Sequence, residues 1–148
     1  MAAVENRDPA RVASGIHPKG SAWAEGRIVA LEEARIPITD WGFTRSDVTY
    51  DVVHVWKGSF FRLDEHIARF QASMAGLHMS IPMAGDDIAA ILHDCVRASG
   101  LKDAYVAMIC TRGNPAPGGP RHPANCVNRF WAFVLPWSIT SQRLGRSS

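Results

Sequence analysis

Valine and aromatic residues alternate with other residues from Asp47 to Trp56, and this pattern restricts the possible folds of the chain more than any other feature. Valine and aromatic residues recur there at every second position, and successive side chains of a β-strand point to opposite faces of a sheet. A Lys57-Gly58 turn then leads into Ser59 to Phe61, which predicts a hairpin. One predicted strand face carries Val48, Tyr50, Val52, His54 and Trp56, and the other carries Thr49, Asp51, Val53 and Val55.

Two amphipathic helices are predicted after this hairpin. The first opens at Leu63-Asp64 with Asp64 as its N-cap, and its apolar positions are Ile67, Phe70, Met74 and Leu77. The second runs from Asp87 to Ser99 and stops at Gly100, and its apolar positions are Ile88, Ile91, Leu92, Cys95 and Val96. Because a sheet needs a covered face, we expect both helices on the same face. They should bury Ile67, Phe70, Met74, Ile88, Leu92 and Cys95.

Further strands are predicted on either side of the helices. Ala22 to Ala24 and Arg27 to Ala30 suggest a short hairpin about Glu25-Gly26, and later strands are expected at Ala104 to Thr111 and Val127 to Leu135. Trp41 to Phe43 is interpreted as a connection, and the proline-rich stretch Gly113 to Pro123 as a stiff irregular loop. This order of elements predicts an α+β domain with an antiparallel or mixed sheet.

Length and composition favour one globular domain. The chain has 148 residues, 47% of them hydrophobic and 20% charged, which argues against disorder and coiled coil. We expect residues 1–20 to form a flexible arm, 21–137 the folded domain and 138–148 a divergent tail.

Charge and cysteine content exclude several functional classes. A net charge of +2 is too small for a nucleic-acid-binding surface. No run of about 18 apolar residues predicts a membrane span, and the first residues lack the apolar stretch of a signal peptide. Cys95, Cys110 and Cys126 are odd in number and far apart, so neither a disulfide framework nor a zinc site is indicated. A reducing cytoplasm is the expected location.

Motif spacing alone completes no catalytic site. The six histidines have no metal-binding spacing, so no metal is expected, and the chain has neither a nucleophile elbow nor a glycine-rich phosphate loop. Arg62 and Arg69 could bind a phosphate through their guanidinium groups. Alternatively, Arg69 pairs with Glu65 one helical turn earlier. Tyr50 could line a pocket or be an ordinary core tyrosine.

Three neighbouring segments form a familiar pattern when read together: Asp40-Trp41-Gly42-Phe43, Arg45-Ser46-Asp47-Val48-Thr49-Tyr50-Asp51-Val52 and Trp56-Lys57-Gly58-Ser59-Phe60-Phe61-Arg62-Leu63-Asp64-Glu65-His66-Ile67-Ala68-Arg69. Together they resemble the small N-terminal domain of class IV aminotransferases, the fold-type IV pyridoxal-phosphate enzymes. Branched-chain and D-amino-acid aminotransferases belong to this family, as does aminodeoxychorismate lyase. The segment Ser46 to Asp51 is similar to the (R)-selective amine transaminase branch. The resemblance spans Ser21 to Pro136.

The resemblance implies roles for seven residues. Arg69 would bind the 5′-phosphate of pyridoxal phosphate, and we expect its guanidinium to point toward the sheet face that carries Tyr50. Tyr50 would lie near the cofactor and Val52 in a pocket wall. Arg45 stands where amine transaminases often carry histidine, and Arg121 lies in a loop that can reach substrate carboxylates in relatives. The residues implied at the substrate site are Arg45, Tyr50, Val52, Tyr105, Ala107 and Arg121.

The family reaction also needs a lysine that binds the cofactor covalently and an acidic partner for the pyridine nitrogen. Relatives carry both in a larger second domain, and Lys19, Lys57 and Lys102 do not match the family lysine. The resemblance therefore implies part of a transaminase that is inactive alone. The complete enzyme would be a homodimer that transfers an amino group between an amine or amino acid and a keto compound. Two alternatives stay open: a non-catalytic module that binds a partner chain or a phosphate ligand, and a fragment of a lyase-type enzyme.

Overall fold

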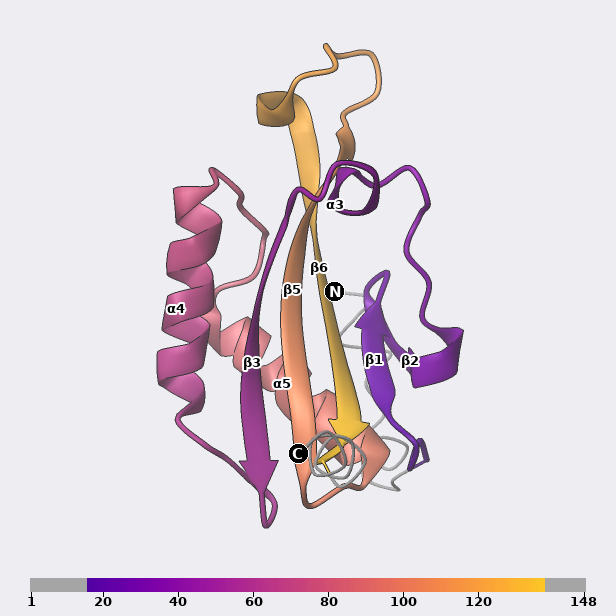
Figure 1. Ribbon diagram of the computed structural model, residues 1–148, viewed down its shortest axis with the longest axis vertical. Coiled ribbons are helices and arrows are strands. Elements are labelled where there is room, and N and C mark those ends of the chain that lie inside the picture. Colours follow the sequence, from indigo (N-terminus) through magenta and orange to yellow (C-terminus); the bar gives the residue numbers. More distant parts are fainter. Residues whose placement is uncertain (1–15, 138–148) are drawn as a thin grey trace, which may run out of the picture.

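Strands that lie far apart in the sequence join in one sheet. The computed structural model describes residues 16–137, and its six strands lie in the order β2-β1-β6-β5-β3-β4 (Figure 1). All the pairings in this part of the chain are antiparallel, which confirms the α+β prediction and makes the sheet antiparallel. The strands are β1 Ser21–Ala24, β2 Arg27–Ala30, β3 Val48–Trp56, β4 Ser59–Phe60, β5 Ala104–Pro115 and β6 Cys126–Pro136.

Strand β3 alternates between its two faces as the sequence predicts. Val53 and Val55 are buried, whereas Tyr50 and Trp56 on the other face are 64% and 53% exposed. Strand β3 pairs with β5 along most of its length and turns through Lys57-Gly58 into β4. Both hairpins expected from the sequence are therefore confirmed, since β1 also pairs with β2.

Helices α4 (Leu63–Gly76) and α5 (Gly85–Ser99) cover one face of the sheet (Figure 1). The six side chains expected beneath them are all buried: Ile67, Phe70, Met74, Ile88, Leu92 and Cys95. Burial of one such side chain contributes about 1.5–3 kcal/mol. The helices pack against Trp23, Val53, Val106 and Phe130 from the sheet. Among residues 16–137, no such helical layer lies on the opposite face, which carries Tyr50, and we call it the open face.

The beginning of α4 differs from the sequence prediction. The helix starts at Leu63, and the preceding Arg62 adopts a left-handed conformation with φ of 55°. Asp64 is therefore not the N-cap and lies in the first turn, where a negative charge favours the helix dipole. The helix ends at Gly76, so Leu77 falls outside it and is 41% exposed.

Helix α5 begins two residues earlier than expected. The backbone N–H of Ala84 donates to the Asp87 carboxylate at 2.9 Å, so Asp87 stabilises the first turn from inside the helix. The predicted end is confirmed, because Gly100 terminates the helix with φ of 70°. Only glycine adopts this left-handed conformation without strain.

Two loop predictions were wrong in part. Trp41 to Thr44 form a short helix, α3, whose N-cap Asp40 accepts a hydrogen bond from the Gly42 N–H at 2.7 Å. Strand β5 continues to Pro115, because a register shift between Thr111 and Asn114 lets pairing with β6 resume. Gly113 permits this irregularity with φ of 74°.

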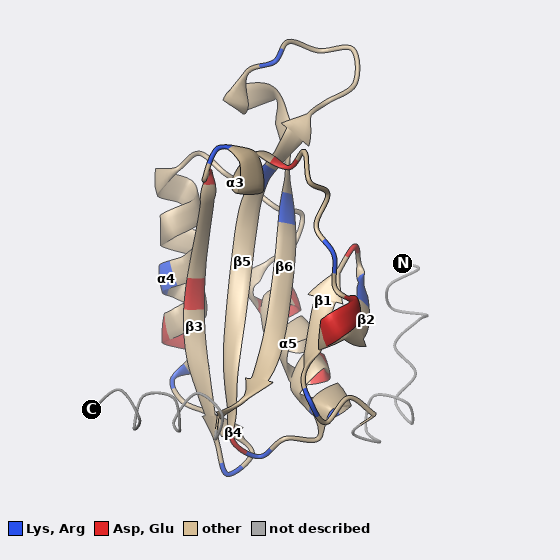
Figure 2. Ribbon diagram, turned by 45° about the vertical axis from the view of Figure 1, so that its right-hand side comes forward, with Lys and Arg blue, Asp and Glu red and all other residues tan. Residues whose placement is uncertain are grey.

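Charged residues are sparse on the sheet itself. Figure 2 shows the long strands mostly in tan, with charges concentrated on helices, turns and strand ends. None of the helices within residues 16–137 is long and apolar enough to cross a membrane. The expected tail at 138–148, and most of the expected arm at 1–20, lie outside the described residues.

Candidate functional site

Arg69 on α4 forms a two-point ion pair with Asp51 on β3. Its Nε donates to Asp51 Oδ2 at 2.6 Å, and its Nη2 donates to Oδ1 at 2.9 Å. The Nδ1 atom of His66 lies 2.8 Å from the same Oδ1. We call these three residues the Arg69 cluster. The cluster joins the helix-covered side of β3 to one turn of α4.

Asp51 is the buried member of this cluster. Its side chain is only 6% exposed, whereas that of Arg69 is 66% exposed. Burial raises the pKa of Asp51, but hydrogen bonds from Arg69 and His66 outweigh it and hold that pKa below its usual range. The same contact raises the pKa of Arg69. Asp51 is therefore a stable anion, and Arg69 stays charged.

Arg69 does not point where the sequence led us to expect. The side chain of Asp51 shares a strand face with Val53 and Val55, opposite the face of Tyr50. The alternative pairing with Glu65 is not formed either, because Glu65 contacts Arg62 at 3.4 Å. Bonding to Asp51 thus keeps Arg69 on the helix side of β3.

Four of the residues expected at a substrate site lie together on the open face. Val52 is directly opposite Ala107 on β5, and His54 is opposite Tyr105. Tyr50 precedes Val52 on the same face and is 64% exposed. The ring of Tyr105 stacks on that of Phe133 from β6, with centroids 6.2 Å apart. These side chains form an apolar surface with phenol groups available for hydrogen bonds.

Arg45 and Arg121 form a separate group beside α3. The guanidinium carbon of Arg45 lies 3.6 Å from the centre of the Trp41 ring, and that of Arg121 lies 5.8 Å from it. Trp41 itself is only 2% exposed. The structure therefore brings these two arginines together through one indole ring, an arrangement that cation–π attraction favours.

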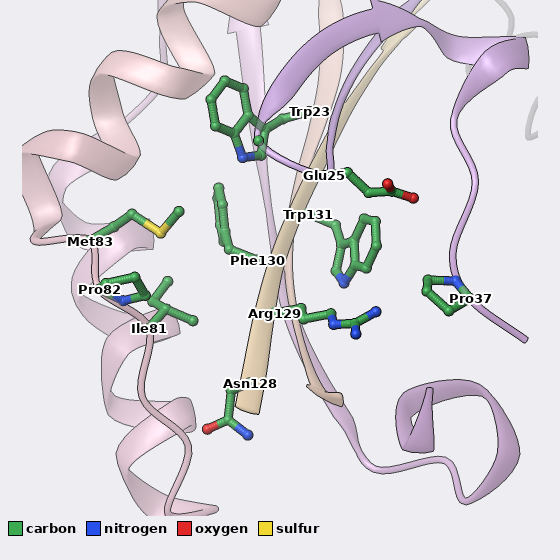
Figure 3. A pocket seen from close by; sticks show the side chains of 11 residues that line it. Trp23, Glu25, Pro37, Ile81, Pro82, Met83, Asn128, Arg129, Phe130 and Trp131 are labelled. Atoms are coloured by element: carbon green, nitrogen blue, oxygen red, sulfur yellow. The ribbon is translucent and has the colours of Figure 1, made fainter. Parts of the chain in front are cut away.

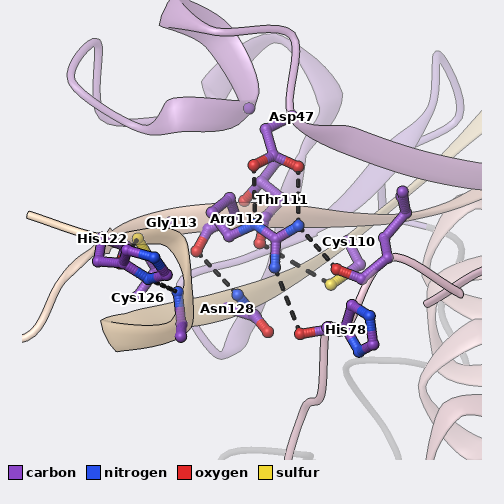
Figure 4. A network of polar contacts seen from close by, with 12 residues as sticks. Asp47, His78, Cys110, Thr111, Arg112, Gly113, His122, Cys126 and Asn128 are labelled. Carbon is purple, nitrogen blue, oxygen red and sulfur yellow. Dashed lines mark hydrogen bonds and ion pairs between the residues drawn. The ribbon is translucent and has the colours of Figure 1, made fainter. Parts of the chain in front are cut away.

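The sequence analysis did not predict a buried polar network around Arg112. Arg112 donates from Nε and Nη2 to Asp47 at 2.8 and 3.1 Å and also reaches the carbonyls of Leu77 and His78 (Figure 4). The hydrogen bonds from Arg112 to Asp47 raise the pKa of Arg112. This network joins β5 to the start of β3 and the end of α4. Its one sequence signal is an arginine that interrupts an apolar strand.

The Asp40 carboxylate forms a second buried connection. It accepts hydrogen bonds from the Thr111 hydroxyl at 2.9 Å and from the backbone N–H groups of Gly42 and Gly113. Thr111 in turn accepts a hydrogen bond from the Trp131 indole at 3.0 Å. These bonds hold α3 against β5 and β6, so the Asp-x-Gly motif has a structural role here.

A cavity of about 480 Å³ lies at the edge of β6 beyond the end of β1 (Figure 3). Trp23, Phe130 and Met83 give it apolar walls, and Arg129 and Glu25 also line it. None of the seven residues expected at the site lines this cavity. Within residues 16–137, no three His, Cys, Asp or Glu side chains gather as metal ligands would.

Comparison with known proteins identifies relatives of this chain. Residues 49–147 match the family described as amino-transferase class IV. A D-alanine aminotransferase from Listeria monocytogenes is 33% identical over 90 residues, which are 61% of this chain and 31% of that protein. A putative branched-chain-amino-acid aminotransferase from Methanocaldococcus jannaschii is 28% identical over 91 residues, 62% of this chain and 32% of that protein.

Solved structures show the same fold. The T.th. branched-chain amino acid aminotransferase, crystallised with pyridoxamine 5′-phosphate, superposes with a TM-score of 0.70 at 24% identity over 80% of this chain and 40% of that one. The Escherichia coli enzyme gives 0.71 at 18% identity over 80% and 41%. The chain thus spans less than half the length of the relatives it matches. With its sequence match and its two-helix antiparallel sheet, this chain belongs to the class IV aminotransferases.

Proposed function

We propose that this chain supplies the small-domain half of the active site of a pyridoxal-phosphate-dependent transaminase, with Arg69 as a contact to the cofactor phosphate. The geometry of Arg69 carries the proposal. Asp51 accepts hydrogen bonds from Nε and Nη2 of Arg69. The Nη1 atom of Arg69 has no partner among the described residues, and the Arg69 side chain is 66% exposed. Two N–H groups on a fixed, permanently charged plane suit a phosphate oxygen.

The cofactor, when bound, would supply the electron sink that lets an amino group leave one carbon and join another. This chain's own residues would bind and orient the cofactor and the substrate. Arg69 would hold the phosphate at the outer edge of β3, which β4 leaves unpaired before Val55. The cofactor would reach across this edge to the open face, where Tyr50, Val52, Tyr105 and Ala107 would contact the substrate. We propose an amine or amino acid and a keto compound as the substrates.

Arg45 and Arg121 would contribute positive charge at one end of this substrate surface. Both are exposed while their indole partner Trp41 is buried, so each can reach a ligand without losing its aromatic contact. A carboxylate on the substrate is the group that a guanidinium binds best. Arg45 and Arg121 would therefore both contact the substrate.

The covalent lysine would come from sequence beyond these 148 residues. Lys57 lies in the turn before β4 and Lys102 in the connection before β5, and both are exposed, as is Lys19. Lysines that act as nucleophiles are activated by desolvation in an apolar pocket or by a neighbouring cation, and an exposed lysine lacks such desolvation. The chain alone should not transaminate.

The open face would receive the rest of the enzyme and a second subunit. Tyr50 and Trp56 on this face are each more than half exposed, and apolar surface of this kind usually marks an interaction site. The complete enzyme would therefore be a homodimer. Cys95, Cys110 and Cys126 are all unpaired, which fits a cytoplasmic protein.

The first test of this proposal measures covalent labelling and turnover. The 148-residue chain is incubated with pyridoxal phosphate, reduced with borohydride and analysed by peptide mass spectrometry, beside an amine-plus-pyruvate assay. We expect no turnover and only scattered, substoichiometric labelling. Stoichiometric labelling of one lysine together with turnover would show that the chain carries its own catalytic amine.

A second test addresses Arg69. Pyridoxal phosphate binding to the unmodified chain is compared with binding to Arg69→Gln and to Arg27→Gln, an exposed arginine on β2 that serves as the matched control. Arg69→Gln should lose most of the phosphate-dependent binding, and Arg27→Gln should not. Equal binding by all three would remove the phosphate role and favour the non-catalytic alternative.

A further inference from the structure

The carboxylate of Asp51 is held more firmly than that of an ordinary surface ion pair. Its Oδ1 accepts a hydrogen bond from the backbone N–H of Val52 at 2.9 Å and is contacted by His66 Nδ1 at 2.8 Å. Arg69 binds both oxygens. The carboxylate is thus bonded both from its own strand and from α4.

These contacts decide whether the Nδ1 atom of His66 donates or accepts a hydrogen bond. An ionised carboxylate only accepts hydrogen bonds, so the His66 nitrogen beside it must carry a proton. Arg69 Nη2 lies 3.2 Å from the same nitrogen, and two donors cannot bond to each other. Both therefore converge on Asp51 Oδ1, and His66 supports the carboxylate without binding Arg69.

We propose that Asp51 is the positioning residue for the anion site at Arg69. It holds the guanidinium plane in one orientation, so that the two N–H groups of Nη1 face a phosphoryl group. The inference rests on the phosphate role proposed for Arg69 above. Asp51, itself held by Val52 and His66, would orient the exposed Arg69 for phosphate binding.

Two opposite effects of Asp51 must be compared. Its negative charge cancels part of the charge on Arg69, so its removal should strengthen attraction for an anion. Both water and salt screen attraction between exposed groups. Without Asp51, however, a long side chain that is 66% exposed becomes free to rotate, and binding must then order it again. We expect the loss of order to outweigh the gain in charge.

The test uses the 148-residue chain and inorganic phosphate at pH 8 and constant ionic strength. The ¹H–¹⁵N signal of the Arg69 Nε–H group reports binding, and its disappearance in Arg69→Lys assigns it. Asp51→Asn should weaken phosphate binding about three- to tenfold although it removes a negative charge. Asp51→Glu should recover most of the affinity, because it restores a carboxylate with two acceptor oxygens.

Glu33→Gln provides the matched control. Glu33 is exposed on the turn after β2, and its substitution also removes one negative charge. It should leave phosphate affinity unchanged. An Asp51→Asn chain that is folded and binds phosphate as tightly as the unmodified chain, or more tightly, would overturn the positioning role.

A measurement on the unmodified chain keeps the inference testable if Asp51→Asn fails to fold. Without ligand, the Arg69 Nε–H group should already exchange slowly with solvent and show the order of a fixed side chain. A freely rotating Arg69 would overturn the inference while leaving the phosphate role intact. If phosphate leaves the Arg69 signal unchanged, the phosphate role itself fails, and the positioning role fails with it.

Discussion

Arg112 on β5 and Asp47 at the start of β3 form a two-point ion pair although 65 residues separate them in the sequence. The Arg112 side chain is 8% exposed and that of Asp47 is 24% exposed. Because Arg112 also donates to the carbonyls of Leu77 and His78, one guanidinium joins three parts of the fold.

Loss of this pair should destabilise the domain. Arg112→Gln leaves a partly buried carboxylate and two backbone carbonyls without their donor, so we expect a loss on the order of 3 kcal/mol in unfolding free energy. Urea denaturation followed by circular dichroism measures it. Arg97→Gln is the control, because the Arg97 side chain is 59% exposed in its pair with Asp94 and such pairs contribute at most about 1 kcal/mol. Equal losses in the two variants would refute this account.

Gly113 should tolerate no side chain. A Cβ atom there would overlap the carbonyl oxygen of Val127, and the residue has φ of +74°. Gly113→Ala should therefore cost more than the roughly 1 kcal/mol of left-handed strain alone. Gly118→Ala is matched, since Gly118 has φ of +78° and open space around it. Thermal denaturation of both variants separates the clash from the strain, and the clash is absent if the two melt alike.

Asp51 should make stability depend on acidity. Its pKa is lowered below 3.8 in the folded chain, so its contribution is fully present above that value. The contribution is lost as the pH falls through the folded pKa. Denaturation at a series of pH values from about 6 downward should show a decline that is smaller in Asp51→Asn. Parallel curves for the two proteins would mean that Asp51 is not the group responsible.

The open face should make the isolated chain associate with itself. Tyr50 and Trp56 are 64% and 53% exposed on it, and paired faces would bury this apolar surface. Size-exclusion chromatography at increasing concentration should show species larger than a monomer. Tyr50→Ser with Trp56→Ser should reduce them, whereas Leu77→Ser, which changes a residue 41% exposed after α4, should not. A stable monomer at all concentrations would contradict this expectation.

Local periodicity was sufficient to predict most of the fold. The alternation around Val53 and the apolar spacing around Phe70 each depend on neighbouring positions, so the strand, both helices and their shared face could be found. The irregular pairing at Gly113 could not, because it depends on a partner strand that begins at Cys126. The short helix at Trp41 likewise depends on distant hydrogen bonds between Asp40 and β5.

Side-chain direction was harder to predict than residue type. The motif singled out Arg69 but did not predict its bond to Asp51, because 18 residues and a hairpin separate them. The partner, Asp51, was already part of the predicted strand, on the face that it shares with Val53 and Val55. A carboxylate at an apolar position is a signal that a cation should lie above it, and Arg69 is the residue that meets it.

Asp51 also affects what can attach to the sheet from outside. Strand β4 pairs with β3 only at Val55 and Trp56, and Phe61 N–H donates to the His54 carbonyl. From Val48 to Val53, therefore, no strand in the described part of the chain pairs with the outer edge of β3. Uncovered margins invite strands of other molecules, and a charged side chain directed inward from the outer strand discourages such additions. The same carboxylate that orients Arg69 should therefore help to keep newly made chains from joining edge to edge.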